Sequence, residues 1–224
     1  MFSKSIIKKT SYTSDDRELC FSPAGKKFCF ASHRNGNYDI FVMNVERGFS
    51  KTQITTSFND EILPNWSPRG NLIAFFQFSN TARDWYIWTK NLENGQFTQI
   101  CQGINPIFFI HGKQIYYKES REKYFELWRI DFDEKNDTQL IANSKWGVGC
   151  FSVSADERYI IYSSLKGFYS NKYNVKRSND GVDLWGLNLQ SGAQIQVTMH
   201  KAPILILYGR QLDMSFLHPR TWDR

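Results

Sequence analysis

A phrase that recurs along the chain constrains its fold more than any other feature of the sequence. The best copy, residues 64–76, predicts a short strand, a turn at Pro68-Arg69-Gly70 and a second apolar strand. Proline presets φ at the second position of such a turn, and glycine supplies the positive φ at its end. A second copy lies at 21–30, and weaker copies lie at 109–117 and 151–162. A repeat of this size indicates the architecture before any single residue is interpreted.

Three sequence markers keep the same register in four copies of the repeat. The turn position holds Gly25, Gly70, Gly112 and Glu157, at spacings of 45, 42 and 45 residues. The second marker is an acidic residue before two apolar residues, at Asp39, Asp84, Glu126 and Asp183. The third is a glutamine before a hydrophobic residue, at Gln53, Gln99, Gln139 and Gln196. Repeats of about 40–45 residues with four short strands each predict an all-β fold, a β-propeller of four-stranded antiparallel blades.

The repeat divides the chain into predicted blades within a single propeller domain. The four clear blades cover residues 14–60, 61–103, 104–146 and 147–201, and a partial fifth blade covers 202–224. The fourth blade carries an insertion at 166–180, between its second and third strands. Loops of this length are uncommon unless they are functional or disordered.

Composition narrows the classes of partner and compartment. The net charge of +6 and the pI near 9.1 suit an acidic protein partner but fall short of the charge typical of a nucleic-acid-binding protein. No apolar run is long enough to predict a membrane span. Residues 1–10 lack the apolar segment of a signal peptide, which for this sequence predicts a cytoplasmic location. The four cysteines lack metal-ligand spacing, so we expect free thiols.

Catalytic motifs are missing from the sequence. The four histidines fall at different repeat positions, and there is no nucleophile elbow, zinc-protease helix motif or phosphate-binding glycine loop. We therefore expect a protein that is not an enzyme and that carries no cofactor and no metal. Most tryptophans occupy repeat positions, which favours packing over ligand stacking for Trp66, Trp85, Trp88, Trp128 and Trp185.

Two segments carry a resemblance to a known family. The pattern Trp66-Ser67-Pro68-x-Gly70-x-x-Ile73-Ala74-Phe75, followed by Asp84-x-Tyr86-x-Trp88, resembles the WD40-like repeat of the TolB family. The same repeat occurs in the noncatalytic propeller of prolyl oligopeptidase-type peptidases. The resemblance extends over about residues 14–200. It implies six blades, a role in protein–protein interaction and, where the N-terminus is incomplete, a periplasmic location.

The resemblance leaves the closure of the ring open between two alternatives. In the family an N-terminal strand often completes the last blade, and residues 5–9 are placed to do so. Either that strand and the partial blade close an atypical five-bladed ring, or the chain is a truncated six-bladed propeller. An open ring would leave an unpaired strand edge, which predicts self-association.

Two sets of candidate binding residues follow from the propeller topology, because the loops between blades and the loops between second and third strands share one face. The basic and aromatic rim consists of Arg34, Arg83, Arg121, Lys123, Tyr169, Lys172, Tyr173, Lys176 and Arg177. The acidic channel rim consists of Asp15, Asp16, Asp60 and Glu61. The first set suits an acidic protein surface or an anionic glycan, and the second suits Ca²⁺ or a basic peptide. The alternative for both is a solvated or turn-capping role.

These observations support a noncatalytic propeller that acts as a protein–protein interaction or scaffold module through its loop-rich face. Two alternatives stay open. One is the detached or truncated propeller domain of a prolyl oligopeptidase-type hydrolase, and the other is a glycan-binding propeller. The fold alone does not choose among them.

Overall fold

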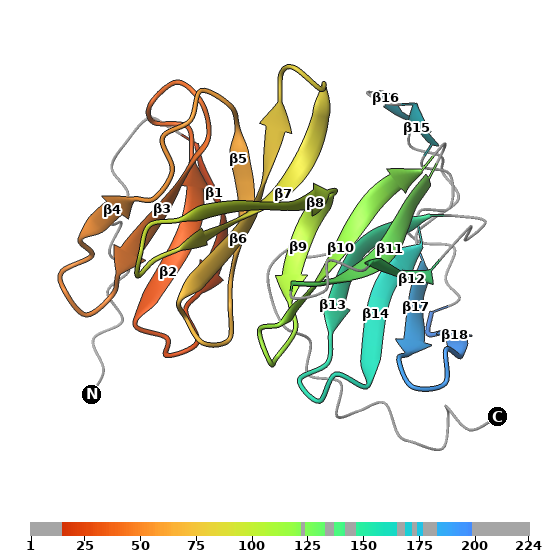
Figure 1. Ribbon diagram of the computed structural model, residues 1–224. Helices are drawn as coiled ribbons and strands as arrows, with labels where there is room; N and C mark the ends of the chain where they lie inside the picture. The colour runs from red at the N-terminus through yellow and green to blue at the C-terminus, as the bar shows by residue number, and fades with distance from the viewer. Residues whose placement is uncertain are drawn as a thin grey trace. The chain divides into compact units, whose positions relative to one another are not determined.

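The computed structural model describes residues 15–121, 124–132, 137–141, 147–164, 169–171, 174–176 and 183–198. The strand predicted at 5–9 and the partial blade at 202–224 lie outside these ranges, so both alternatives for ring closure stay predictions. The regular structure of the described residues is entirely β-strand (Figure 1). The chain divides into two compact units, residues 1–101 and 102–224.

The first unit contains two antiparallel sheets whose strands pair in chain order. One has the order β1-β2-β3-β4 and the other β5-β6-β7-β8. The strands of the first sheet are β1 (Asp16–Phe21), β2 (Lys27–Ser32), β3 (Asp39–Asn44) and β4 (Lys51–Gln53). Those of the second are β5 (Glu61–Trp66), β6 (Leu72–Ser79), β7 (Asp84–Asn91) and β8 (Phe97–Gln102).

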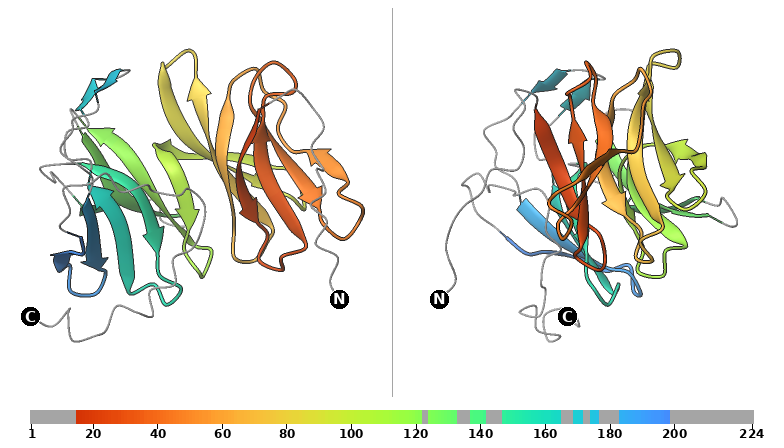
Figure 2. Two further views of the ribbon diagram at one scale, coloured as in Figure 1. Left: turned by 180° about the vertical axis from the view of Figure 1, so that it is seen from behind. Right: turned by 90° about the vertical axis from the view of Figure 1, so that its left-hand side faces the viewer.

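The second unit contains two further four-stranded sheets and a short hairpin (Figure 2). One sheet consists of β9 (Ile104–Phe108), β10 (Gln114–Arg121), β11 (Tyr124–Asp131) and β12 (Asp137–Ile141). The other consists of β13 (Val148–Val153), β14 (Tyr159–Ser164), β17 (Asp183–Asn188) and β18 (Gln194–Gln196). The insertion contributes the hairpin of β15 (Tyr169–Asn171) and β16 (Asn174–Lys176). The four sheets confirm the predicted all-β fold of four-stranded antiparallel blades.

The turn marker of the sequence has the backbone conformation that it predicts. Gly25, Gly70 and Gly112 have φ values of 69°, 75° and 68°, and Glu157 adopts 53° at the same position of the fourth repeat. Each of the four amides donates a hydrogen bond of 2.8–2.9 Å to the carbonyl three residues earlier. The fourth turn therefore keeps its geometry with a residue that rarely adopts a left-handed conformation.

The acid and glutamine markers of the repeat meet in space in two of the four sheets. Gln53 Nε2 donates to Asp39 Oδ2 at 3.0 Å, and Gln139 Nε2 donates to Glu126 Oε2 at 2.6 Å. In both sheets the acid begins or lies in the third strand and the glutamine lies in the outer strand. The two markers therefore recur together because they hold the outer strand onto the sheet.

A further repeated feature is a bulge in the first strand of three sheets. Glu18, Leu63 and Asn105 have φ values of 59°, 50° and 59°, and the pairing register shifts beside each of them. Their spacings of 45 and 42 residues equal those of the turn glycines. A bulge of this kind bends its strand and increases the local twist.

Each unit has its own apolar core. In the first unit the buried residues come from the facing sides of the two sheets, and they are Cys29, Ala31, Ile40, Val42, Trp66, Ile73 and Phe75. In the second unit they are Tyr116, Leu127, Val148, Phe151, Val153, Ile160, Tyr162 and Leu187. The described ranges contain no helical segment of the length and apolarity that a bilayer span requires.

Candidate binding site

Three connectors of the first unit lie at one end of its two sheets, which we call the loop end. They are 33–38 between β2 and β3, 54–60 between β4 and β5, and 80–83 between β6 and β7 (Figure 1). Antiparallel order brings them together, because the second strand of each sheet ends where its third strand begins. The sharp β1–β2 and β5–β6 turns lie at the opposite end.

The connector 54–60 is held in place by hydrogen bonds to the connector 33–38. Asn37 Nδ2 donates to the carbonyls of Ser57 and Asn59, at 3.0 and 2.8 Å. The amide of Tyr38 donates to Asp60 Oδ1 at 2.9 Å, and its carbonyl accepts from the amide of Glu61 at 2.7 Å. The loop therefore has a defined conformation rather than a free one.

Phe58 lies at the tip of this connector with 99% of its surface exposed. Its two neighbours are bonded to each other, since the amide of Asn59 donates to Ser57 Oγ at 3.0 Å. In the isolated chain this exposed apolar ring contributes no free energy of burial to the fold. Phe58 is the most exposed large hydrophobic residue in the part of the chain that the structure describes.

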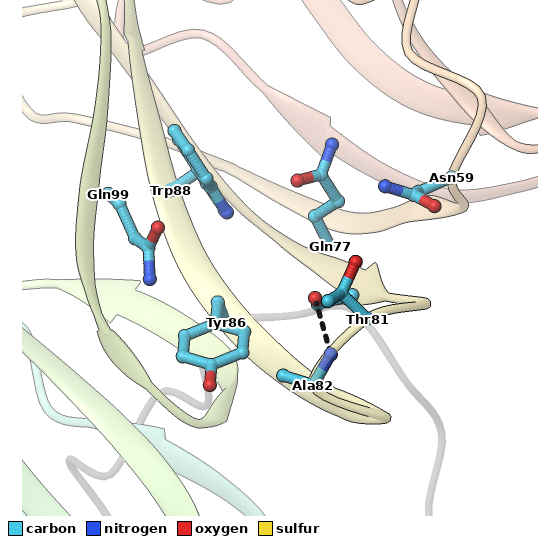
Figure 3. A pocket seen from close by; sticks show the side chains of 8 residues that line it. Asn59, Gln77, Thr81, Ala82, Tyr86, Trp88 and Gln99 are labelled. Atoms are coloured by element: carbon cyan, nitrogen blue, oxygen red, sulfur yellow. Dashed lines mark hydrogen bonds between the residues drawn. The ribbon is translucent and has the colours of Figure 1, made fainter.

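A pocket of about 360 Å³ opens beside this connector. Figure 3 shows Tyr86 and Trp88 in its middle, Gln99 on one side, and Gln77 and Asn59 on the other. Its lining consists of amides, hydroxyls, two aromatic rings and one methyl group, from Asn59, Gln77, Ser79, Thr81, Ala82, Tyr86, Trp88 and Gln99. Every lining side chain is uncharged at neutral pH.

All four residues of the predicted acidic rim lie at the loop end, and each one has a partner there. Asp16 pairs with Arg34 at 3.1 Å, and Asp15 Oδ2 accepts a 2.6 Å hydrogen bond from the Tyr38 hydroxyl. Asp60 accepts from the Tyr38 amide, as described above. These bonds are those of residues that cap loops and join strands, and their predicted role in binding a cation or a basic peptide stays a prediction.

Glu61 is the fourth acidic residue, and it lies in the interior rather than on a rim. It has no exposed surface, and its Oε1 accepts hydrogen bonds from Gln77 Nε2 at 2.6 Å and from Ser57 Oγ. Burial raises the pKa of Glu61, and these hydrogen bonds oppose the rise. Within the described ranges, no three histidine, cysteine, aspartate or glutamate side chains gather as metal ligands.

The predicted basic rim is described only in part. The Arg34 side chain is 10% exposed, donates to Ser32 Oγ at 2.8 Å and stacks 4.2 Å from the Phe41 ring centre, so its charge is used within the first sheet. Arg83 is exposed in the connector between β6 and β7. The backbones of Arg121, Tyr169 and Lys176 lie in β10, β15 and β16, where Tyr169 pairs with Lys176.

Lys123, Lys172, Tyr173 and Arg177 lie outside the described residues. The rim as a binding surface therefore stays a prediction.

Sequence reasoning missed both Phe58 and the pocket. Phe58 belongs to no repeated pattern, so nothing marked it. Trp88 was assigned to packing because it occupies a repeat position, and its ring does pack against the core of the first unit while it also lines the pocket. In the paired strands the positions equivalent to Trp88 hold Phe41, Trp128 and Trp185, so a comparison of the copies gives no signal for the pocket at this position.

Comparisons with known proteins place this geometry in a family. The family model of the TolB beta propeller domain matches residues 5–200. TolB from Acinetobacter baumannii is similar in structure with a TM-score of 0.69 at 18% identity, over 84% of this chain and 45% of that one. A protein described as putative TolB from Agrobacterium tumefaciens gives 0.68 at 16% identity, over 81% and 64%.

A prolyl endopeptidase structure gives a TM-score of 0.61 at 12% identity, over 84% of this chain and 30% of that one. The chain thus spans less than two thirds of each of these structures, and identities this low concern the fold alone. No curated protein sequence matches it. Because the family model covers most of the chain, the protein belongs to the TolB β-propeller family.

Proposed function

We propose that this protein is a noncatalytic TolB-type propeller that binds a protein partner through its loop end, with Phe58 as the anchor. The observation that carries the proposal is a fully exposed phenylalanine on a loop that hydrogen bonds fix to Asn37 and Tyr38 of the connector 33–38. Buried aromatic side chains are prominent among the residues that dominate the energy of protein interfaces.

The rigidity of the connector supports this role through the entropy of binding. A flexible loop loses conformational freedom when a partner immobilises it, and that loss opposes association. In 54–60 the loss has already occurred on folding, because Asn37, Tyr38 and Asp60 fix the backbone on both sides of the ring. A partner with an apolar pocket would then gain most of the energy from burying Phe58.

The net charge of this chain indicates which charges surround the apolar pocket of the partner. The net charge of +6 attracts an acidic partner over distances up to about the screening length. This attraction raises the rate of association more than it raises the affinity of the complex. We therefore expect the partner surface to be acidic around an apolar pocket. The rate of association should fall as salt is added.

The experiment places a photoreactive benzoyl-phenylalanine at position 58 and, in a matched protein, at position 26. Lys26 is also exposed, but it lies in the β1–β2 turn at the opposite end of the sheet. We expect one protein to crosslink on irradiation from position 58 and not from position 26, and mass spectrometry identifies it. Equal crosslinking from both positions, or none from position 58, would contradict the proposal.

The remaining hypotheses for this chain stay predictions. A scaffold role, self-association through a blade edge and membership in a larger hydrolase each concern parts beyond the described residues or beyond this chain. The likeness to a prolyl endopeptidase at 12% identity supports the fold and not an activity. The compartment, cytoplasmic by the N-terminal sequence or periplasmic by family resemblance, is likewise a prediction.

A further inference from the structure

We propose that the pocket formed by β6, β7 and β8 binds a neutral carbohydrate of one or two sugar rings. This inference goes beyond the protein partner proposed above, because it concerns a different ligand and residues other than Phe58. Four features of the lining support it, namely an aromatic pair, an unengaged glutamine, a second glutamine of fixed polarity and side chains without charge.

The aromatic pair comes from one face of β7. Tyr86 and Trp88 are two residues apart and so point to the same side of the strand, and Gln77 on β6 pairs directly with Tyr86. A sugar ring has an apolar face of C–H groups, which packs against the face of an aromatic ring. Figure 3 shows the two rings next to each other between the amide side chains.

The tyrosine is peculiar to this blade. Tyr86 pairs with Gln77, seven residues after the turn glycine Gly70, and the residues paired in the same way in the other sheets are the acids Asp39, Glu126 and Asp183. By the same register Trp88 corresponds to Phe41, Trp128 and Trp185, so an aromatic residue at its position is common to all four blades. Trp88 is half-buried, and one part of it packs on the core while another lines the pocket. The pocket therefore differs from the other blades in its tyrosine rather than in its tryptophan.

The glutamine of the outer strand is also used differently in this blade. Gln53 and Gln139 each donate to the acid of their own sheet. Gln99 holds the same marker position, yet its side chain makes no hydrogen bond to any of the described residues, and it lines the pocket. An amide can donate and accept at once, as a sugar hydroxyl can, so Gln99 suits a pair of neighbouring hydroxyls.

Gln77 presents a fixed acceptor on the other side of the pocket. Its Nε2 donates to Glu61 Oε1 at 2.6 Å and to Ser57 Oγ at 2.9 Å. Both amide protons are thereby engaged, which leaves the Gln77 carbonyl oxygen to accept from a ligand hydroxyl. The hydroxyls of Thr81 and Tyr86 and the Trp88 indole N–H make no hydrogen bond to the described residues, and they add further donors to the lining.

Charge and size select the class of sugar. The lining has no ionised group, so it offers no partner for a uronate, a sulfate or an amino sugar. The volume of about 360 Å³ lies at the lower end of the range of about 300–1,000 Å³ for small-ligand sites. One or two rings therefore fit, and a longer glycan would contact the pocket with its end.

The test measures binding of defined sugars by calorimetry and by saturation-transfer NMR. The neutral probes are methyl glucoside, methyl galactoside, N-acetylglucosamine, maltose and cellobiose, and the charged probes are glucuronic acid and glucosamine. Two variants change the pocket. Trp88→Leu removes the indole ring from the lining, and Gln99→Leu removes the amide from an exposed outer-strand position. Circular dichroism establishes that both variants are folded.

We expect at least one neutral probe to bind and the charged probes not to bind. Trp88→Leu should weaken binding about tenfold, and Gln99→Leu about threefold to tenfold. Phe58→Ser should leave sugar binding unchanged, while the two pocket variants should still crosslink to a protein from position 58. The inference is overturned if no neutral probe binds at about 10 mM, if only charged probes bind, or if folded Trp88→Leu binds as tightly as the natural chain.

Discussion

The carboxyl groups of Asp39 on β3 and Glu61 on β5 interact electrostatically, and both side chains are buried at the junction of the first two sheets. Within the described residues, Asp39 Oδ1 and Glu61 Oε2 have no hydrogen-bond partner. Burial raises the pKa of both groups, and hydrogen bonds from Asn35 and Gln53 to Asp39 and from Ser57 and Gln77 to Glu61 oppose the rise. Two buried acids that repel each other are best accommodated when one of them is protonated.

Replacing Glu61 by glutamine should therefore stabilise the fold at neutral and alkaline pH. The amide keeps an acceptor for Gln77 and offers an N–H to Asp39, and no charge is buried. In the natural chain the pKa of Glu61 is higher in the folded state than its ordinary value of 4.5. Folding thus takes up protons, and this contribution to stability grows as the pH falls through the folded-state pKa and is lost as the pH rises through it.

Thermal denaturation at about pH 8 and about pH 5 checks this prediction. The melting temperature of Glu61→Gln should exceed that of the natural chain at the higher pH, and the difference should shrink at the lower pH. Glu93→Gln, at an exposed position, is the matched control and should show neither effect. A lower melting temperature for Glu61→Gln at about pH 8 would contradict the prediction that the buried charge of Glu61 destabilises the folded chain.

A second prediction concerns the turn glycine of the best-preserved repeat. Gly70 has φ of 75°, and a Cβ placed there would come no closer than 3.7 Å to Pro23 Cδ. Gly70→Ala should therefore lose about 1–2 kcal/mol of unfolding free energy from backbone conformation alone. Urea denaturation measures the loss. Arg69→Ala changes the exposed neighbouring turn residue and should lose much less; equal midpoints for the two variants would refute the conformational account.

A third prediction tests Thr55, which follows the outer strand of the first sheet. Thr55 Oγ1 accepts a 2.8 Å hydrogen bond from the buried Ile40 amide, and Thr198 Oγ1 accepts at 2.9 Å from the Leu184 amide at the same repeat position. Thr55→Val keeps the shape but leaves the amide without that acceptor, so we expect a loss of about 1–3 kcal/mol. Thr52→Val on the exposed face of β4 should cost far less, and a similar cost for both would count against this role.

A fourth prediction concerns the thiol of Cys20. Cys20 and Cys29 lie directly opposite each other on β1 and β2, and both are free thiols. A hydrogen bond from Cys29 lowers the pKa of Cys20 to about 7, whereas burial raises the pKa of Cys29 well above its ordinary value. Alkylation should therefore modify Cys20 first, with a rate that reaches half its maximum near pH 7.

Peptide mapping after brief treatment with iodoacetamide over a range of pH gives that profile. In Cys29→Ala the midpoint for Cys20 should move to higher pH, because the main cause of the lowered pKa is gone. Modification of Cys29 before Cys20, or a midpoint unmoved by Cys29→Ala, would contradict the assignment.

The fold could be predicted from sequence because its markers act locally. Gly25, Gly70 and Gly112 each determine the conformation of one turn. A turn between two apolar segments can be predicted from a stretch of about ten residues. The bulges could not be predicted, because Glu18, Leu63 and Asn105 share no chemistry and owe their left-handed conformation to the strand beside them. The same holds for Glu157, whose side chain also bonds the amide of Ile110 from the neighbouring sheet of its unit.

The site could be predicted only as a region. Topology correctly brought Asp15, Asp16, Asp60 and Arg34 to one end of the first unit. It could not show that Arg34 turns inward to Asp16, because the burial of a long side chain depends on rings such as Phe41 on the next strand. Counting charges on a rim therefore overestimates how many of them face a partner.

The most direct test of the account compares the affinity of the crosslinked partner for three purified proteins. Phe58→Ser removes the proposed anchor, and Phe21→Ser removes another phenylalanine that is 57% exposed on β1, away from the connector 54–60. We predict that the dissociation constant rises at least about tenfold for Phe58→Ser and little for Phe21→Ser, relative to the natural chain. Unchanged affinity for Phe58→Ser would contradict binding through the loop end.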